Sequence, residues 1–523
     1  MTRRLIWLVE IEAGIASSPP EEIVLRLTND PKGYNAPTAP APYVHILSKV
    51  VNIQRTISAS RRTFGEATIS TGTIEVANSG DLDEWFSYAY GRPARVLVGY
   101  NDAPYDEFKV VISGRVEQAS GDARRIVFRF QDRTKELDRI VSPVTYAGDN
   151  SGTTGREGTA DDVGGAHKIQ VRGVNINVSP DPINAANQVF AVNHDGDGEL
   201  KAVHSIDGVR VNGSPWNNIG DEATIAALEA ASVTQGNFRT CLAAGALKAG
   251  GTWQGALTCD VTTSGTAANN RIANVARDLL LSVGVVSADI DLGTLDTDAP
   301  WTVGVVNRGE TARELLNSLL GESAIWYAPN SSGVYELRLV ELPTGAPVVT
   351  LKPFDFPNRA AAGEFQIVDL TPEFSSIAEI SLPAWRVTVN YGRRWTVQDK
   401  DGLAAAIGLE AKEFYSREYS KVSVFDDDIK AFYPDAPELE FTTLLKNESD
   451  AQALAQHLFD VYSVPHALYR VTACLCPAVA EVQLGDVVRL IHPRYGLSAG
   501  KLGRVIGEQF DAVNNTAVLE VWT

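Results

Sequence analysis

Hydrophobic and polar residues alternate over much of the first 140 positions. The alternating apolar positions are Val96, Val98 and Tyr100 in one run and Ile126, Phe128 and Phe130 in another. A period of two is typical of a strand with one buried face. In EATISTGTIEV the apolar positions change parity across Gly72, which predicts a one-residue β-bulge at this glycine. A short helix over TKELDRIV closes this β-rich segment, with a boundary near Pro143.

The clearest helical pattern begins after residue 268. Apolar residues recur there in one stripe at i, i+3, i+4, i+7, i+8 and i+11, namely Ile272, Val275, Ala276, Leu279, Leu280 and Val283. Asn269 or Asn270 is available as the N-cap. Thr311 and Glu314 have the capping-box spacing ahead of a leucine-rich run. A third helix is predicted from about Ser449 to Tyr462.

Strand patterns return in the second half of the chain. They are IWYAPNSSGVYELRLV as a hairpin, WRVTVNY, ALYRVTACL, LGDVVRLI, GRVIGEQF and a last hairpin into AVLEVWT. Residues 144–268 are instead rich in Gly, Asn, Thr, Ser and Ala, with turn signals about every ten residues. This predicts an inserted β module with exposed loops.

These patterns predict an α+β, β-rich multidomain protein with barrel or sandwich modules and small helical segments. The expected segments are an N-terminal β-rich domain (1–143), the inserted β module (144–268), an α+β domain with a second β module (269–400) and a C-terminal α+β domain that ends in a small β domain (401–523). A length of 523 residues is sufficient for several domains with cores of their own.

Charge and composition exclude some classes of protein. With 46 Lys and Arg against 65 Asp and Glu, the net charge is 46 − 65 = −19, which argues against a protein wrapped by nucleic acid. The apolar run from Leu5 to Val9 is too short for a signal peptide, and no run reaches the roughly 20 apolar residues of a membrane span. Four cysteines do not make a disulfide scaffold. We expect a chain made in the cytoplasm, without a signal peptide or membrane span.

The sequence carries no recognised catalytic motif. It has no G-x-S-x-G, H-E-x-x-H, G-x-x-x-x-G-K-[ST] or strand-linked G-x-G-x-x-G pattern, and none of its seven histidines has metal-ligand spacing with a second one. We therefore predict no catalytic, cofactor-binding or metal-binding residues, no cofactor and no enzymatic activity.

Three groups of acidic residues are weaker candidates for a functional site. Asp195, Asp197 and Glu199 occupy positions 1, 3 and 5 of a calcium-type loop, but Leu200 and Ile206 stand where that loop needs Gly and Glu. A solvated acidic turn is the better interpretation. The acidic pairs at 81 and 83 and at 426–428 are interpreted in the same way, although paired carboxylates can serve glycoside hydrolysis.

The four cysteines fall into two pairs. Cys241 and Cys259 lie 18 residues apart and can form a bridge if their module is exposed to an oxidant. Cys474 and Cys476 lie two residues apart on one strand face, with no second pair to complete a zinc site. We interpret both pairs as small buried hydrophobes and leave the bridge open.

Two segments resemble tail hub proteins of long-tailed, siphovirus-like bacteriophages and related gene transfer particles. The first is RRTFGEATISTGTIEVANSGDLDEWFSYAYGRPARVLVGY, where Asn78, Gly80 and Asp81 are turn formers and Trp85 and Phe86 would hold a short helix on the sheet. The second is the C-terminal segment from Leu484 to Trp522. Its matching positions are Leu484, Gly485, Asp486 and Val488 in an L-G-D-x-V turn and Pro493, Arg494, Gly496 and Leu497 in a P-R-x-G-L loop.

Between these ends, APWTVGVV (299–306) and RVTVNYGRRWTVQ (386–398) are also similar to the family, so the resemblance covers about three quarters of the chain and matches the insertion only loosely. It implies a baseplate hub, a homotrimer that closes the distal end of the tail tube, adapts six-fold to three-fold symmetry and surrounds the channel for DNA ejection. Two related β-barrel domains per chain are implied, for which the N-terminal module and part of 299–400 are the candidates. The implied partners are the distal tail ring protein, the tape-measure protein, a central tail fibre or spike and phage DNA in transit, in the tail tip of the virion.

Two alternatives remain open from the residues. In one, the 144–268 insertion binds a host receptor or glycan, with Trp216 and Trp253 stacked on sugar rings, although core packing of these tryptophans is the favoured interpretation. In the other, which is less supported, the chain is a tail-associated cell-wall hydrolase.

Overall fold

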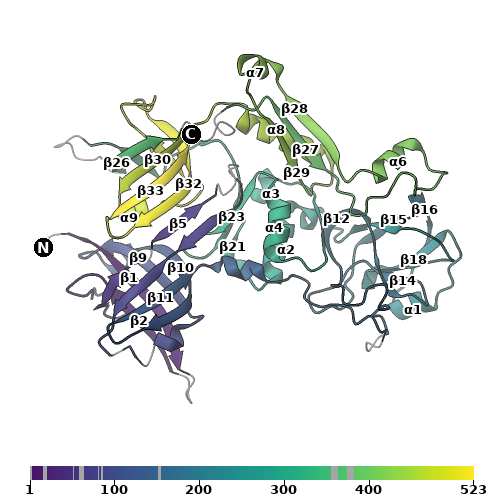
Figure 1. Cartoon of the computed structure of the whole chain (residues 1–523), viewed down its shortest axis with the longest axis horizontal. Coiled ribbons are helices and arrows are strands. Elements are labelled where there is room, and N and C mark those ends of the chain that lie inside the picture. Colours follow the sequence, from purple (N-terminus) through teal and green to yellow (C-terminus); the bar gives the residue numbers. More distant parts are fainter. Residues whose placement is uncertain are drawn as a thin grey trace. The chain divides into compact units, whose positions relative to one another are not determined.

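The computed structural model describes residues 3–15, 21–50, 52–57, 64–80, 82–83, 86–150, 155–354, 363–373 and 382–523. The chain packs into two compact units that interleave along the sequence (Figure 1). Unit 1 contains Met1–Lys135, Trp326–Pro383 and Val461–Thr523, and unit 2 contains Glu136–Ile325 and Ala384–Asp460.

Unit 1 contains two large β-sheets. The first has the order β3-β2-β1-β9-β10-β11-β8-β4. Its strands are β1 (Leu5–Ile15), β2 (Glu21–Thr28), β3 (Val44–His45), β4 (Leu47–Lys49), β8 (Thr73–Ala77), β9 (Pro93–Tyr100), β10 (Lys109–Gly121) and β11 (Arg125–Gln131). The alternation predicted for β11 is confirmed, because Ile126, Phe128 and Phe130 are buried while Arg125 and Arg129 are exposed.

The buried carboxylate of Glu10 joins β1 to three other segments of unit 1 through hydrogen bonds. Glu10 on β1 is 6% exposed and accepts hydrogen bonds from the Tyr43 and Tyr105 hydroxyls and from Arg95. Burial alone would raise the pKa of Glu10, but these hydrogen bonds bring that pKa below its ordinary value. The carboxylate is therefore held charged by three partners.

The second large sheet closes on itself. Strand β31 pairs in parallel with β25 and antiparallel with β32, which completes a six-stranded ring in the order β31-β25-β26-β30-β33-β32. These strands are β25 (Val349–Lys352), β26 (Glu364–Pro372), β30 (Leu468–Cys474), β31 (Val487–Leu490), β32 (Lys501–Asp511) and β33 (Thr516–Trp522). Two N-terminal strands, β5 (Ile53–Thr56) and β7 (Thr68–Thr71), extend the sheet beyond β32.

Gly72 lies where the chain passes from one of these sheets to the other. Strand β7 pairs with β5 in the second sheet, whereas β8 pairs with β11 in the first. The predicted β-bulge is therefore wrong, because the parity change at Gly72 separates two strands of different sheets. Both sheets contribute to one continuous core of buried apolar residues.

Smaller elements complete unit 1. They are β6 (Gly65–Glu66), β23 (Ile325–Pro329), β24 (Tyr335–Leu339), α9 (Pro477–Ala480) and the 3-10 helices Phe86–Ala89, Tyr105–Glu107 and Arg133–Asp138. The last of these, a six-residue 3-10 helix, takes the place of the α-helix predicted over TKELDRIV. β23 pairs with both β24 and β6, so the predicted 325–340 hairpin is confirmed.

Unit 2 contains three sheets. The first, in the order β16-β15-β20-β12-β22, is built from β12 (Gln170–Val178), β15 (Ser205–Val211), β16 (Ser214–Pro215), β20 (Leu257–Thr262) and β22 (Gly304–Asn307). The second, β13-β14-β19-β18-β17, is built from β13 (Asp181–Asn184), β14 (Val189–Ala191), β17 (Asn217–Asp221), β18 (Asn237–Cys241) and β19 (Ala246–Ala249). The third places β27 (Arg386–Tyr391) between β28 (Ser420–Phe425) and β29 (Glu438–Thr442). A short strand, β21 (Ile290–Asp291), also lies in this unit.

The remaining described helices are α1 (Ile225–Ala230), α2 (Ile272–Ser282), α3 (Leu295–Asp298), α4 (Ala312–Leu320), α6 (Leu409–Tyr415), α7 (Asp427–Phe432) and α8 (Glu448–Tyr462), with 3-10 turns at Leu242–Ala244, Ala267–Asn270 and Ser287–Asp289. Among these helices, α2 and α4 bury the apolar stripes predicted from the sequence, whereas α6 and α7 have no buried residue. The predicted capping box of α4 is confirmed, with Thr311 accepting from the Glu314 amide. The N-cap of α2 is Arg271 and not Asn269 or Asn270, because the latter two residues belong to the preceding 3-10 turn.

The predicted fold class, α+β, β-rich and multidomain, is confirmed. Of the expected boundaries, the one near Pro143 lies close to the Lys135–Glu136 boundary between the units. The expected insertion shares a sheet with a later segment, since β22 pairs with β12. In the described part of the chain, no helix has the length and apolar character needed to cross a membrane.

Candidate functional site

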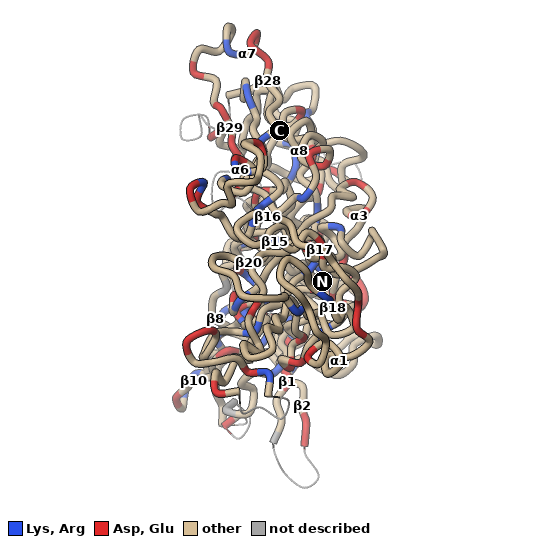
Figure 2. The backbone as a smooth tube through the Cα atoms, turned by 90° about the vertical axis from the view of Figure 1, so that its right-hand side faces the viewer, with Lys and Arg blue, Asp and Glu red and all other residues tan. Residues whose placement is uncertain are grey.

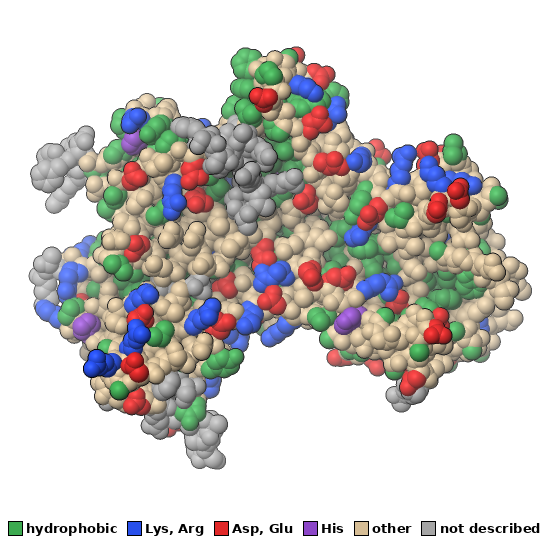
Figure 3. Space-filling view, viewed as in Figure 1, with side chains coloured by type: hydrophobic (Ala, Val, Ile, Leu, Met, Phe, Trp, Pro, Cys, Tyr) green, Lys and Arg blue, Asp and Glu red, His purple; other side chains and the backbone are tan. Residues whose placement is uncertain are grey.

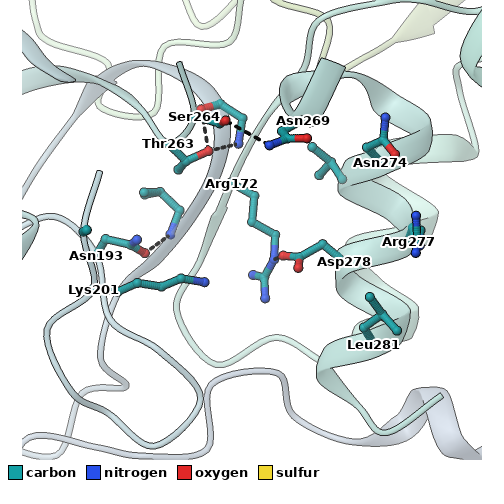
Figure 4. Close-up of a pocket in the computed structure, with 14 residues that line it drawn as sticks. Arg172, Asn193, Lys201, Thr263, Ser264, Asn269, Asn274, Arg277, Asp278 and Leu281 are labelled. Atoms are coloured by element: carbon teal, nitrogen blue, oxygen red, sulfur yellow. Dashed lines mark hydrogen bonds and ion pairs between the residues drawn. The ribbon is translucent and has the colours of Figure 1, made fainter. Parts of the chain in front are cut away.

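A cleft in unit 2 is a candidate site. It has a volume of about 420 Å³ and is bordered by β12, the segment around Asn193 and Lys201, the turn at Thr263 and Ser264, and helix α2 (Figure 4). A second hollow of about 280 Å³ shares the central lining of the first and extends toward His194 and Asp195. The two hollows form one elongated cleft with a polar lining.

Helix α2 presents its polar face to the cleft. The apolar stripe of α2 packs into the interior of unit 2, where Ile272, Val275 and Leu279 are almost fully buried. The opposite side, with Asn274, Arg277, Asp278 and Leu281 at i, i+3, i+4 and i+7, lines the opening. Because of the helical period, the apolar residues of α2 fall on its buried side and the polar residues fall on the side that lines the cleft.

Arg172 and Asp278 join the β12 wall to the helix wall. Arg172 Nε donates to Asp278 Oδ2 at 2.7 Å, and the Arg172 side chain is only 12% exposed against 53% for Asp278. Arg172 Nη1 also donates to Gln170 Oε1 at 3.4 Å. The guanidinium group is thus held in a fixed position at the cleft.

The opposite wall carries a second positive charge that is not neutralised. Lys201 forms no ion pair with any residue that the structure describes, and Figure 4 shows its side chain extending into the opening. Arg277 donates to Ser287 Oγ at 2.9 Å and, within the described ranges, also lacks a carboxylate partner. Three cations (Arg172, Lys201 and Arg277) and one anion (Asp278) line the larger hollow, so its formal charge is 3 − 1 = +2.

A buried amide lies beside these charges. Asn193 is 2% exposed, and its Oδ1 accepts a hydrogen bond from the Val171 amide at 3.0 Å. The Asn193 amide nitrogen has no hydrogen-bond partner among the described residues. Across the cleft, Asn269 Nδ2 donates to Ser264 Oγ at 3.1 Å. The site therefore combines positive charge with side chains that donate and accept hydrogen bonds.

The acidic loop that resembled a calcium site is a self-contained turn. Asp195 Oδ1 accepts hydrogen bonds from the amides of Asp197 at 3.0 Å and Glu199 at 2.9 Å. The Asp195 carboxylate thus closes a turn of its own backbone, and the absence of a calcium site there stays a prediction. No group of three or more His, Cys, Asp or Glu side chains in the described ranges is arranged to hold a metal ion.

The two tryptophans proposed for sugar stacking pack on the core of the insertion. Trp216 and Trp253 are half-buried and meet edge to face at 5.3 Å, and Phe190 lies 6.0 Å from Trp253. The favoured interpretation, core packing, is confirmed, and neither tryptophan lines the cationic cleft.

The cysteines differ in burial, since Cys241 and Cys259 are buried and Cys474 is exposed. Cys241 and Cys259 are buried, free and in different core clusters, and burial raises the pKa of both thiols. The prediction that Cys474 is buried is wrong, because it ends β30 on the exposed side. Asp426 caps α7 by accepting from the Asp428 amide at 2.8 Å, and residue 81 lies outside the described residues.

The hub-like motifs form turns in unit 1. Asn78 Oδ1 accepts from the Gly80 amide at 2.9 Å, and its amide donates to Asp83, while Trp85 and the Phe86 side chain lie outside the described part. In the L-G-D-x-V turn, Gly485 has φ +86°, and a Cβ there would lie 2.6 Å from Trp326 Cζ2. The Gln483 amide donates to Asp486 Oδ2 at 2.8 Å.

A buried ion pair lies next to this turn. Arg55 on β5 and Glu508 on β32 are 2% and 0% exposed and form a direct ion pair, and Arg55 Nη2 also donates to Gln483 Oε1 at 3.1 Å. Burial raises the pKa of Glu508 to about 7, opposed by Arg55 and assisted by the negative charges of Asp486 and Glu336. Burial also raises the pKa of Asp486. These residues couple the N-terminal strand β5 to the C-terminal barrel.

Sequence reasoning did not identify the cleft. The one indication of the cleft in the sequence is the set of polar residues on α2, which lie on the side of the helix opposite its apolar stripe. Arg172, Asn193 and Lys201 come from separate segments and share no motif, so only the folded chain brings them together.

Comparisons with known proteins give limited similarity. No family model matches the chain, and no curated protein matches it. It is similar to the solved structures of a 43 kDa tail protein of prophage MuSo2 from Shewanella oneidensis (11% identity, TM-score 0.40, 98% of both chains) and a tail protein from Neisseria meningitidis MC58 (9% identity, TM-score 0.42, 99% of this chain and 96% of that chain). A third is prophage tail protein gp18 from Listeria monocytogenes EGD-e (8% identity, TM-score 0.37, 99% and 94%). At these identities and TM-scores we rest no functional statement on the similarity.

Proposed function

We propose that this chain is a structural component of a phage tail and, more specifically, the hub at the distal end of the tail tube. The observation that carries the proposal is the construction of unit 1, where two β modules share one apolar core. Both segments that resemble hub proteins lie in this unit, the first containing β6 through β9 and the second reaching from the L-G-D-x-V turn to β33.

The proposed symmetry follows from having two β modules in one chain. A closed ring needs the same kind of surface at every contact. Three chains with two similar modules each would offer six such surfaces to a six-fold ring above them. The second module differs from the expected one, because only β25 and β26 come from residues 299–400, while four strands of the ring come from residues 468–522.

The proposed partners are a distal tail ring protein, a tape-measure protein, a central fibre or spike and phage DNA in transit. A net charge of −19 per chain suits a channel that releases DNA, since acidic surfaces repel phosphate groups. Figure 2 shows acidic and basic residues interspersed along the chain, with acidic residues at the start of α7. We propose the virion tail tip as the location and a role without catalysis.

The first experiment is the mass of the purified chain by light scattering, together with negative-stain images. The hub proposal expects a trimer near three times 56.4 kDa with a central opening. Because assembly can require a neighbouring protein, the same measurement is made after addition of the distal tail ring protein of the same particle. A monomer in both samples, with no three-fold density in tails that contain the chain, would overturn the proposal.

A further inference from the structure

We propose that the cationic cleft of unit 2 binds the acidic group, carboxylate or phosphate, of a saccharide. The proposal adds a ligand site to a protein whose proposed role is structural. It does not depend on the oligomeric state, so it can fail or hold independently of the hub proposal.

Charge at the cleft is opposite in sign to that of the whole chain. The chain carries −19, yet the lining of the larger hollow sums to +2. Lys201 and Arg277 reach the cleft without a carboxylate partner in the described ranges, so their charges are available to an incoming anion. Hydrogen bonds between such cations and an oxyanion are about twice as strong as neutral ones.

Arg172 adds a preorganised contact. Its Nε is bound to Asp278, and its Nη1 contacts Gln170, which fixes the plane of the guanidinium group. Among the described residues, Arg172 Nη2 has no hydrogen-bond partner and remains for a ligand oxygen. A planar group held in place loses little entropy when it binds a carboxylate or phosphate.

Neutral polar groups around the cations fit a ligand rich in hydroxyl groups. Asn193 is buried as a residue, but its amide nitrogen has no hydrogen-bond partner in the described part of the chain, and the residue lines the cleft, so this donor is available to a ligand oxygen. Ser264 and Asn269 offer further oxygens and amide groups on the other side of the cleft. A fully ionised inorganic anion accepts from the donors among these groups but donates nothing to their oxygens, whereas sugar hydroxyls both donate and accept.

The size of the cleft favours a small unit over a nucleic acid. A volume of about 420 Å³ lies in the range of small-molecule sites. A DNA duplex gains affinity from many phosphate contacts along a basic surface, and three cations in an acidic chain provide few of these. The lining contains no aromatic residue, so recognition here would depend on charge and hydrogen bonds instead of ring stacking.

The test is calorimetric titration of the full-length chain with glucuronic acid, glucose 6-phosphate and glucose. We expect one or both acidic sugars to bind about tenfold or more tightly than glucose, because the net free energy of a charge-assisted hydrogen bond exceeds the free energy that corresponds to a tenfold change in affinity. Binding of glucuronic acid alone would identify a carboxylate as the ligand group, and binding of glucose 6-phosphate alone would identify a phosphate.

Matched variants separate the cleft from general charge effects. The cleft variant Lys201→Gln/Arg277→Gln removes the two unpaired cations, and the control Lys400→Gln/Arg417→Gln removes the same charge from exposed positions elsewhere in unit 2. All four side chains are exposed, so both variants should fold, which circular dichroism checks. We expect the cleft variant to lose binding about tenfold or more and the control to keep it.

Three outcomes would overturn the proposal. In the first, neither acidic sugar binds more tightly than glucose. In the second, the cleft variant binds the acidic sugars as well as the control does. In the third, a short DNA duplex binds and displaces the sugars, which would assign the cleft to nucleic acid.

Discussion

The buried Arg55–Glu508 pair makes the stability of unit 1 depend on pH in a predictable direction. Burial raises the pKa of Glu508 to about 7 from an ordinary value of 4.5. A carboxyl group with a raised pKa binds its proton more tightly in the folded state than in the unfolded state. Its contribution is fully present below pH 4.5 and is lost as the pH rises through about 7.

The size of this effect follows from the shift. At about 1.4 kcal/mol per pKa unit, a rise from 4.5 to about 7 corresponds to roughly 3 kcal/mol. Glu508→Gln places a neutral side chain of the same shape beside Arg55, as the protonated carboxyl does. We expect the variant to resemble the wild type near pH 4 and to exceed it in stability by roughly 3 kcal/mol near pH 8.

Hydrogen exchange measured by mass spectrometry gives the local free energy of opening for β5 and β32. This readout is suitable because a chain with two units need not unfold in one step. Exchange rates are corrected for their intrinsic pH dependence, and Glu22→Gln, at a side chain that is 70% exposed, serves as the control. Parallel pH profiles for the wild type and Glu508→Gln would refute the reasoning.

Two further predictions concern local geometry. Gly485→Ala should destabilise unit 1 by about 2 kcal/mol or more, because φ is +86° and the new Cβ would contact Trp326. The control Gly496→Ala, with φ +72° and open space around the new Cβ, measures the backbone contribution alone. Equal urea midpoints for the two variants would contradict the contribution of the Trp326 contact. Thr311→Ala should lower the stability by about 1 kcal/mol, because it removes the N-cap of α4. Thr311→Ser keeps a capping hydroxyl and should retain most of the wild-type stability. An unchanged melting temperature in Thr311→Ala would contradict the capping role.

Local patterns in the sequence were sufficient to predict many elements. The stripe at Ile272 and Leu279 predicted α2, and the Thr311–Glu314 spacing predicted the capping box, because helices are governed by residues three or four positions apart. Alternation predicted β11 for the same reason. At Gly72 the parity change predicts a bulge and this prediction is wrong, because a parity change alone does not tell a bulge from a change of sheet.

Long-range pairing could not be predicted in this way. The residues of β5 contain no indication that their partner is β32, and β25 pairs in parallel with β31 across more than a hundred residues. The cleft has the same origin, because Arg172, Lys201 and Arg277 are brought together by β12, a loop and α2. Side chains that form a site through tertiary structure have no fixed spacing in the sequence.

The exposed apolar surface near α7 was also not predicted. Phe425 and Phe432 are 54% and 76% exposed, and Figure 3 shows hydrophobic side chains around β28 and α7. Alternation in β28 predicts one exposed face but not which exposed positions are apolar.

The pairing of β5 with β32 sets an order of events during synthesis. Thr56 pairs with Gly507, so nearly the whole chain must be translated before β5 meets its partner. At about 5–20 residues per second, the ribosome would need roughly 20 to 90 seconds to cover this interval. During that time Arg55 has no Glu508 and one edge of the nascent β5 is unpaired. The residues of unit 2, by contrast, are all synthesised before β32 emerges. Unit 1 therefore contains strands that are translated before unit 2, but it can be completed only after the residues of unit 2 have been translated.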